Sequence, residues 1–110
     1  MSYDEGLAER IREQFSEYDD VHEKKMFGGL CFMISGHMCC GIVNDKLMAR
    51  VGPDKYEACL KEKYVTKMDF TGKPMKGLVY VSSDGYESEE ELAIWLARCH
   101  DFIGTLPSRL

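Results

Sequence analysis

The chain has no apolar run that approaches the roughly 20 residues needed by a membrane-spanning helix. Its first residues are acidic, whereas a signal peptide begins with basic residues followed by an apolar segment. We therefore expect a cytoplasmic protein with no membrane contact. The chain also lacks repeats, low-complexity tracts and linkers, and its 110 residues suffice for one hydrophobic core but not for two. We expect a single domain that spans residues 1–110.

Histidine is scarce, with three in the chain, and no phosphate-binding sequence is present. A cysteine nucleophile needs a nearby base and a third group that orients the base. Cys99 and His100 are neighbours on an expected helix, where adjacent side chains do not face each other. Gly28 and Gly29 lack the lysine and hydroxyl residue of a P-loop, and they predict a turn or bulge between strands instead. We therefore expect no catalytic residue.

The five cysteines, an odd number, fall in expected strands and helices, which in a reducing compartment indicates buried free thiols. Potential zinc ligands lie close together in one segment, namely Cys31, His37, Cys39 and Cys40. Adjacent residues of a strand point to opposite faces, so Cys39 and Cys40 should not share a face. No further Cys or His pair completes a tetrahedral site. We expect no metal and no cofactor.

The net charge of −5 is unevenly distributed. Residues 22–76 carry a small excess of basic side chains, and acidic segments precede and follow them. A general nucleic-acid binder needs clustered lysine and arginine to displace counterions from phosphates. The sequence therefore argues against nucleic acid as a partner, while leaving room for a small basic patch.

Apolar periodicity and turn residues predict an alternating series of helices and strands. The expected elements, in chain order, are a helix over 3–18, strands near 23–27, 30–35, 37–44 and 46–51, a helix from 53 to about 61, strands near 65–70 and 77–82, and a helix that begins after residue 88. Capping boxes formed by Ser2 with Glu5 and by Ser88 with Glu91 predict the starts of the first and last helices. The order predicts an α+β fold in which helices pack on an antiparallel sheet.

Several expected strands are apolar on both faces. An antiparallel sheet with one solvated face should alternate apolar and polar residues, but the segments 30–34, 38–43 and 78–81 do not. Either helices cover both faces of the sheet, or one face is buried against another molecule. Because only three helices are expected, we predict a homodimer.

The segment 69–77 is the best candidate for a functional surface. A glycine and a proline stiffen this expected loop, and Lys73 and Lys76 place two positive charges on it. Arg50, near the end of an expected strand, is predicted to point toward the same region. Together, Arg50, Lys73 and Lys76 could hold a phosphate, a carboxylate or an acidic partner helix. The alternative is a loop whose lysines are simply solvated.

Several short segments, most of which contain glycine, follow one another along the chain in a specific order. They are Lys25-Met26-Phe27-Gly28-Gly29, Gly36 before the strand of Met38, Leu47-Met48-Ala49-Arg50-Val51, the stretch from Met68 to Gly77, and the final helix around Trp95. With these features, the chain from Lys25 to about Pro107 resembles the TfoX N-terminal domain family. The resemblance implies a compact α+β fold of the secretion-chaperone-like type, with the order α-β3-α-β2-α.

The resemblance also implies a function. The family is named for TfoX/Sxy, regulators of bacterial competence that act with transcription factors and carry an additional C-terminal helical domain. We expect a single-domain member that acts as a non-catalytic regulatory or protein-interaction domain, linked to transcriptional or competence regulation. Two alternatives stay open: a binder of small anionic ligands or nucleic acid through Arg50, Lys73 and Lys76, and an enzyme whose cleft joins residues distant in sequence.

Overall fold

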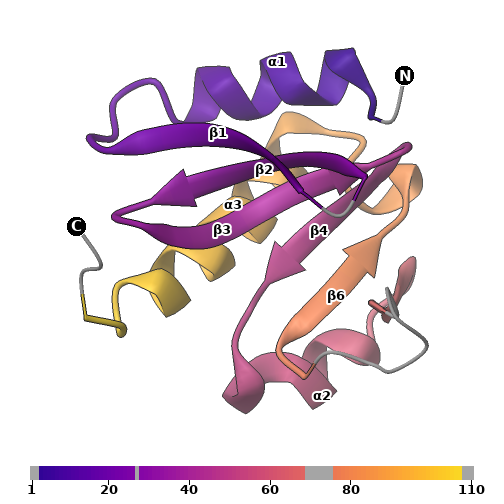
Figure 1. Ribbon diagram of the computed structural model, residues 1–110. Helices are drawn as coiled ribbons and strands as arrows, with labels where there is room; N and C mark the ends of the chain where they lie inside the picture. The colour runs from indigo at the N-terminus through magenta and orange to yellow at the C-terminus, as the bar shows by residue number, and fades with distance from the viewer. Residues whose placement is uncertain (1–2, 27, 69–75, 108–110) are drawn as a thin grey trace.

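The computed structural model describes residues 3–26, 28–68 and 76–107. Within these residues, three α-helices and one six-stranded antiparallel sheet form an α+β fold, which confirms the expected fold class (Figure 1). The elements are α1 (Glu5–Gln14), β1 (Val21–Met26), β2 (Gly29–Ile34), β3 (His37–Val43), β4 (Lys46–Arg50), α2 (Pro53–Leu60), β5 (Val65–Lys67), β6 (Leu78–Val81), the 3₁₀-helix η1 (Ser83–Gly85) and α3 (Glu89–Ile103).

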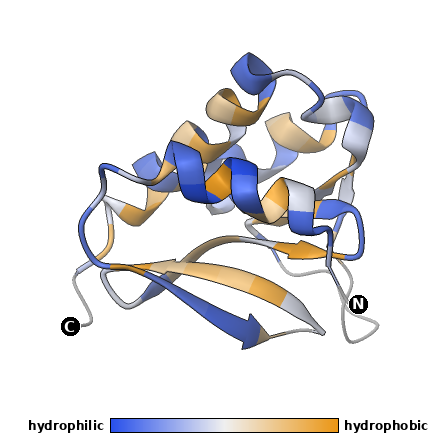
Figure 2. Cartoon of the chain, turned by 90° about the horizontal axis from the view of Figure 1, so that it is seen from above, coloured by the Kyte–Doolittle hydropathy of each residue, from blue (hydrophilic) through white to orange (hydrophobic). Residues whose placement is uncertain are grey.

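The strands are arranged in the order β1-β2-β3-β4-β6-β5, and each neighbouring pair is antiparallel. The helices lie on one side of this sheet, and the opposite side faces the viewer in Figure 1 and the bottom of Figure 2. We call the side without helices the open face. The molecule therefore has two layers over the described residues, one of helices and one of strands.

The main core lies between the sheet and the helices. Phe32, Ile42 and Leu47 point from the strands into this layer and are completely buried. Leu92 and Trp95 meet them from α3, whose apolar residues recur every three or four positions. The helical stripe and the inward-facing strand residues thus form one continuous core, as the periodicity predicted.

A second apolar cluster covers the open face. Its buried members are Cys31, Met38, Met48, Met68 and Leu78, and its partly buried members are Met26, Met33, Val43 and Tyr80. None of these described residues belongs to a helix. The strands are therefore apolar on both faces, as expected, but within the described chain only one face is covered by helices.

The first helix begins differently from the expectation. Its N-cap is Asp4, whose carboxylate accepts hydrogen bonds from the backbone N–H groups of Gly6 and Leu7. The predicted capping box of Ser2 with Glu5 is therefore wrong, since Glu5 is already the first helical residue; Ser2 itself lies outside the described residues. Asp is as good an N-cap as Ser, and Asp4 lies two residues closer to the apolar stripe.

The start of the last helix agrees with the expectation. The Ser88 hydroxyl accepts a hydrogen bond from the Glu91 N–H, and the Glu91 carboxylate accepts one from the Ser88 N–H, both at 3.0 Å. These reciprocal bonds satisfy two backbone donors that the helix itself leaves unpaired. The predicted capping box at the start of α3 is confirmed.

The strand count differs from the order that the family resemblance implied. Four strands precede α2, rather than three, because the polar segment Val21–Met26 pairs along its whole length with β2. Its exposed charged side chains suit a strand at the edge of a sheet, where they discourage further pairing.

No helix in the described part of the chain is long and apolar enough to cross a membrane.

Candidate functional site

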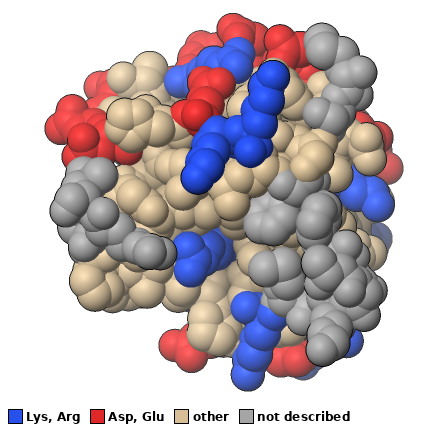
Figure 3. Space-filling model, viewed as in Figure 1, with Lys and Arg blue, Asp and Glu red and all other residues tan. Residues whose placement is uncertain are grey.

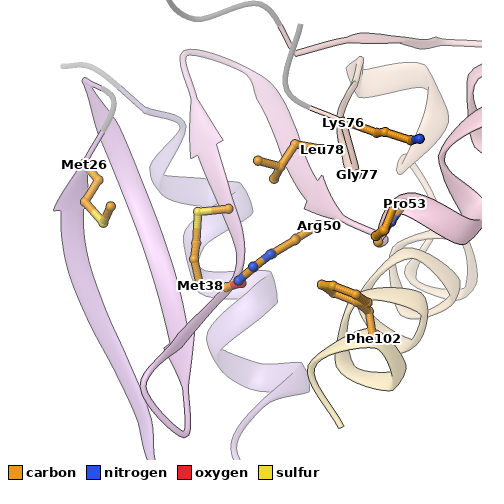
Figure 4. Close-up of a pocket in the computed structure, with 9 residues that line it drawn as sticks. Met26, Met38, Arg50, Pro53, Lys76, Gly77, Leu78 and Phe102 are labelled. Carbon is orange, nitrogen blue, oxygen red and sulfur yellow. The ribbon is translucent and has the colours of Figure 1, made fainter. Parts of the chain in front are cut away.

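A cavity of about 510 Å³ opens where the last residue of β4 and the first residue of β6 meet the start of α2 and the last turn of α3. Met26, Met38, Leu78 and Phe102 supply most of its apolar wall (Figure 4). Its two charged lining residues among those described are Arg50 and Lys76, and both are cations. The cavity is therefore apolar with a local positive charge.

Arg50 reaches this cavity because it is the last residue of β4, on the same side of the strand as Met48. Its Nη1 donates a hydrogen bond of 3.2 Å to the carbonyl oxygen of Met38. Its guanidinium carbon lies 5.3 Å from the centre of the Phe102 ring, within the range of a cation–π contact. These two contacts hold the partly buried guanidinium between β3 and α3.

The remaining donors of Arg50 have no carboxylate partner in the described structure. Salt bridges there involve Arg10, Arg12 and Arg98, each paired with a glutamate. A guanidinium carries five N–H donors in one plane, and the bond to Met38 uses one of them. Arg50 is thus a partly buried cation that can still form a paired hydrogen bond with an anion.

The structure brings two of the three predicted site residues to one cavity. Lys76 lines the same cavity as Arg50, as the sequence predicted, but Figure 4 shows its amine directed away from the Arg50 guanidinium. The two charges therefore do not converge on a single point. Lys73 lies outside the described residues.

Sequence reasoning missed the apolar wall of this site and the contact between Gly52 and Phe102. Gly52 has a φ of +88°, and a Cβ atom there would lie 2.4 Å from the Phe102 ring. The backbone N–H of Gly52 donates to the carbonyl oxygen of Gly77, which also accepts from Val51. The sequence predicted a helix that starts at residue 53, but the contact of Gly52 with α3 depends on tertiary packing that no local pattern reveals.

A cluster of thiols lies in the main core next to the cavity. The register of β2 with β3 shifts between Phe32 and Met33, so Met38 pairs with Met33 and Cys40 with Phe32, and Cys39 is left without a partner. This irregularity breaks the alternation of faces, and Cys39 and Cys40 both join the main core. The prediction that they point to opposite faces is therefore wrong.

Hydrogen bonding sets the ionisation of these thiols. Cys39 accepts hydrogen bonds from Cys40 and Cys99, which lowers the pKa of Cys39 to about 5 and raises the pKa values of the two donors. Electrostatic interaction with the nearby side chains of His100 and Arg50 lowers the pKa of Cys39 further. By contrast, burial alone raises the pKa of Cys31 on the open face to about 11. The cluster thus favours a thiolate on Cys39 over one on Cys40 or Cys99.

We expect Cys39 to be ionised at neutral pH in the folded protein. Because folding lowers its pKa, its contribution to stability is complete above the ordinary thiol value of 9.0 and is lost as the pH falls through about 5. Cys40 and Cys99 keep their protons below pH 9 in both the folded and the unfolded protein, so they do not oppose this loss of stability on acidification. Titrating the ultraviolet absorbance of the thiolate tests the prediction.

The control for this titration is Cys39→Ser, which should remove the transition near pH 5. The difference in unfolding free energy between wild type and the variant should also shrink on acidification, which separates Cys39 from the carboxylates that titrate in the same range. Absorbance that rises only near pH 9 in the wild type would contradict the assignment.

The residues that the sequence offered as potential zinc ligands lie in different parts of the described structure. His37 is buried, and its Nε2 is hydrogen-bonded to the carbonyl oxygen of Pro107 rather than directed at the thiols. Among the described residues, no group of three or more His, Cys, Asp or Glu side chains is positioned to hold a metal ion. All five cysteines are buried and free of disulfides.

Comparison with known proteins identifies one family. The model of the TfoX N-terminal domain matches residues 13–103, which include every strand and all of the cavity-lining residues described above. No curated protein and no solved structure matches the chain.

Proposed function

Because the chain belongs to the TfoX N-terminal domain family, we propose that it is a non-catalytic regulatory domain that acts by binding another protein chain. The regulators for which the family is named act with transcription factors in bacterial competence, and we propose a role of that kind. The chemistry of the cavity supports the non-catalytic part. Of the described residues that line it, none is a His, Cys, Asp or Glu, the side chains that most often transfer protons or attack substrates.

The open face carries this proposal. Its apolar cluster consists of strand residues and Met68, and no described helix packs on it. Figure 3 shows uncharged surface across much of this face, with basic side chains within it and acidic ones mostly near its edges. Methionine is prominent in the cluster, and its flexible side chain adapts well to partner surfaces. Such a face favours contact with another protein.

A second copy of the chain is the first partner that we propose. A symmetric pair would bury the surface that the partly buried members of the cluster still expose on both subunits, without needing another protein. The edge strand β1 is exposed and charged, so the face of the sheet is better suited to this contact than the β1 edge is.

Met33→Glu should weaken this association by about 100-fold or more, because an uncompensated buried carboxylate costs about 3 kcal/mol or more. Met33 is a partly buried member of the open-face cluster, opposite Met38 in the sheet. Size-exclusion chromatography with light scattering at micromolar concentration measures the result as a shift from dimer to monomer. A wild-type protein that is monomeric at this concentration would rule out the homodimer.

The matched control is Ile94→Glu. Ile94 is an apolar residue of α3 with 51% of its surface exposed, on the helix layer rather than the open face. The same change of charge there should leave the dimer intact. Melting curves of both variants distinguish loss of association from loss of fold.

The wider interaction role can be tested separately. Cross-linking and affinity capture from native lysate, with wild type, Met33→Glu and Ile94→Glu as baits, should recover partners with the first and third and not with the second. Equal recovery by all three would count against the open face as the interaction surface.

A further inference from the structure

The cavity beside Arg50 has the chemistry of a small-molecule site. Its volume of about 510 Å³ lies within the range of about 300–1,000 Å³ that is usual for such sites. Its lining combines apolar side chains with two cations, and no acidic side chain is among the described lining residues. We propose that the cavity binds an amphiphilic carboxylate, a small molecule with one carboxylate head and an apolar body.

Arg50 would hold the head of this ligand. A guanidinium presents parallel N–H groups that match the two oxygens of a carboxylate. The contacts with the Met38 carbonyl and the Phe102 ring already fix the orientation of Arg50, so binding costs little additional side-chain order. A single partly buried guanidinium balances a single negative charge, which favours a monocarboxylate over a doubly charged phosphate.

The apolar wall would hold the body of the ligand. Figure 4 shows Met26, Met38 and Leu78 on one side of Arg50 and Phe102 on the other. An inorganic anion would leave this wall exposed to water, whereas an alkyl or aryl chain would cover it. The two methionines can adjust their rotamers to chains of different shape, so we expect selectivity for the head group rather than for one particular body.

Lys76 would act at the entrance of the cavity. Its amine is directed away from Arg50, so it does not share the head group directly (Figure 4). A charge in this position attracts an anion through solvent and is screened by salt. Lys76 should therefore affect the salt dependence of binding more than the affinity.

The ligand class can be tested on the whole chain with octanoate, its neutral analogue octanamide and inorganic phosphate. We expect saturable binding of octanoate by calorimetry, and backbone amide NMR shifts concentrated at the cavity-lining residues. Octanamide should bind about tenfold more weakly or worse, because it cannot form the charge-assisted pair with Arg50. Octanoate that does not bind saturably, or octanamide and phosphate that bind as tightly, would overturn the proposal.

Variants of the chain assign the roles of the two cations. Arg50→Gln should weaken octanoate binding about tenfold or more, whereas Lys76→Gln should change it by less than about threefold and reduce its salt dependence. Lys61→Gln is the control of equal charge, since Lys61 is exposed at the far end of α2 and does not line the cavity. Unchanged affinity in a folded Arg50→Gln protein would overturn the role of Arg50.

If Arg50→Gln does not fold, as judged by its amide spectrum, the comparison of octanoate with octanamide on the wild type still decides the question. The cavity shares Met26, Met38 and Leu78 with the open face. The comparison of octanoate with octanamide depends on the charge of the head group, so it can fail while the association tested by Met33→Glu succeeds.

Discussion

Replacing Trp95 with alanine is expected to lower the free energy of unfolding by about 3–5 kcal/mol. Only 4% of the Trp95 surface is exposed, and the indole packs in the main core between α3 and the sheet. The guanidinium of Arg98 lies 4.5 Å from its ring, so the substitution also removes a cation–π contact. Domains of this size have about 5–15 kcal/mol of stability, so the loss is a large share of the total.

Ile94→Ala is the matched control for Trp95. The two residues are adjacent on α3, but Ile94 is half exposed, and its replacement should change stability by about 0.5 kcal/mol or less. Chemical denaturation of both variants, followed by circular dichroism, gives the two free energies. Similar losses in the two variants would show that Trp95 does not anchor the core.

Gly29→Ala is expected to cost about 3 kcal/mol, at the upper end of the range for overpacked sites. A Cβ atom on Gly29 would lie 1.9 Å from the carbonyl oxygen of Ile42 and 3.0 Å from its carbonyl carbon. These are backbone atoms of the adjacent strand β3, so no side-chain rotation can relieve the overlap. The strands would have to separate, and denaturant unfolding should show a lower midpoint for the variant.

The neighbouring glycine supplies the control. Gly28 has a φ of +73°, yet a Cβ atom there would meet nothing within 4 Å. Gly28→Ala should therefore cost about 1 kcal/mol, from the left-handed backbone alone. A loss for Gly29→Ala no larger than that for Gly28→Ala would contradict the backbone overlap.

The contrast between these glycines shows how far sequence patterns reach. The pair predicted a turn or bulge between strands, and the positive φ of Gly28 agrees with that local requirement. The close approach of β3 to Gly29 depends on strand register, which nothing in the local pattern contains. A glycine required by backbone shape is recognisable in a sequence, while one required by a distant neighbour is not.

Some helix boundaries are likewise set by nearby residues and others by contacts with distant segments. The reciprocal bonds of Ser88 and Glu91 form between residues three apart, so the start of α3 could be predicted. The first helix was expected to reach residue 18, but it ends at Gln14. Tyr18 instead stacks on His100, with ring centres 4.4 Å apart, in a contact between segments far apart in the sequence. Packing of this kind outweighs weak local preference for a helix.

By itself the sequence determined the α+β class, the helical stripe of α3, the two-sided apolar strands and the placement of positive charge at Arg50 and Lys76. These features depend on periodicity and residue type, which act over a few residues. Only the tertiary structure decided the register shift that gathers Cys39 with Cys40 and Cys99, and the approach of Phe102 that makes Arg50 part of a cavity. Both arise from contacts between distant segments, whose geometry is set by packing the whole core at once.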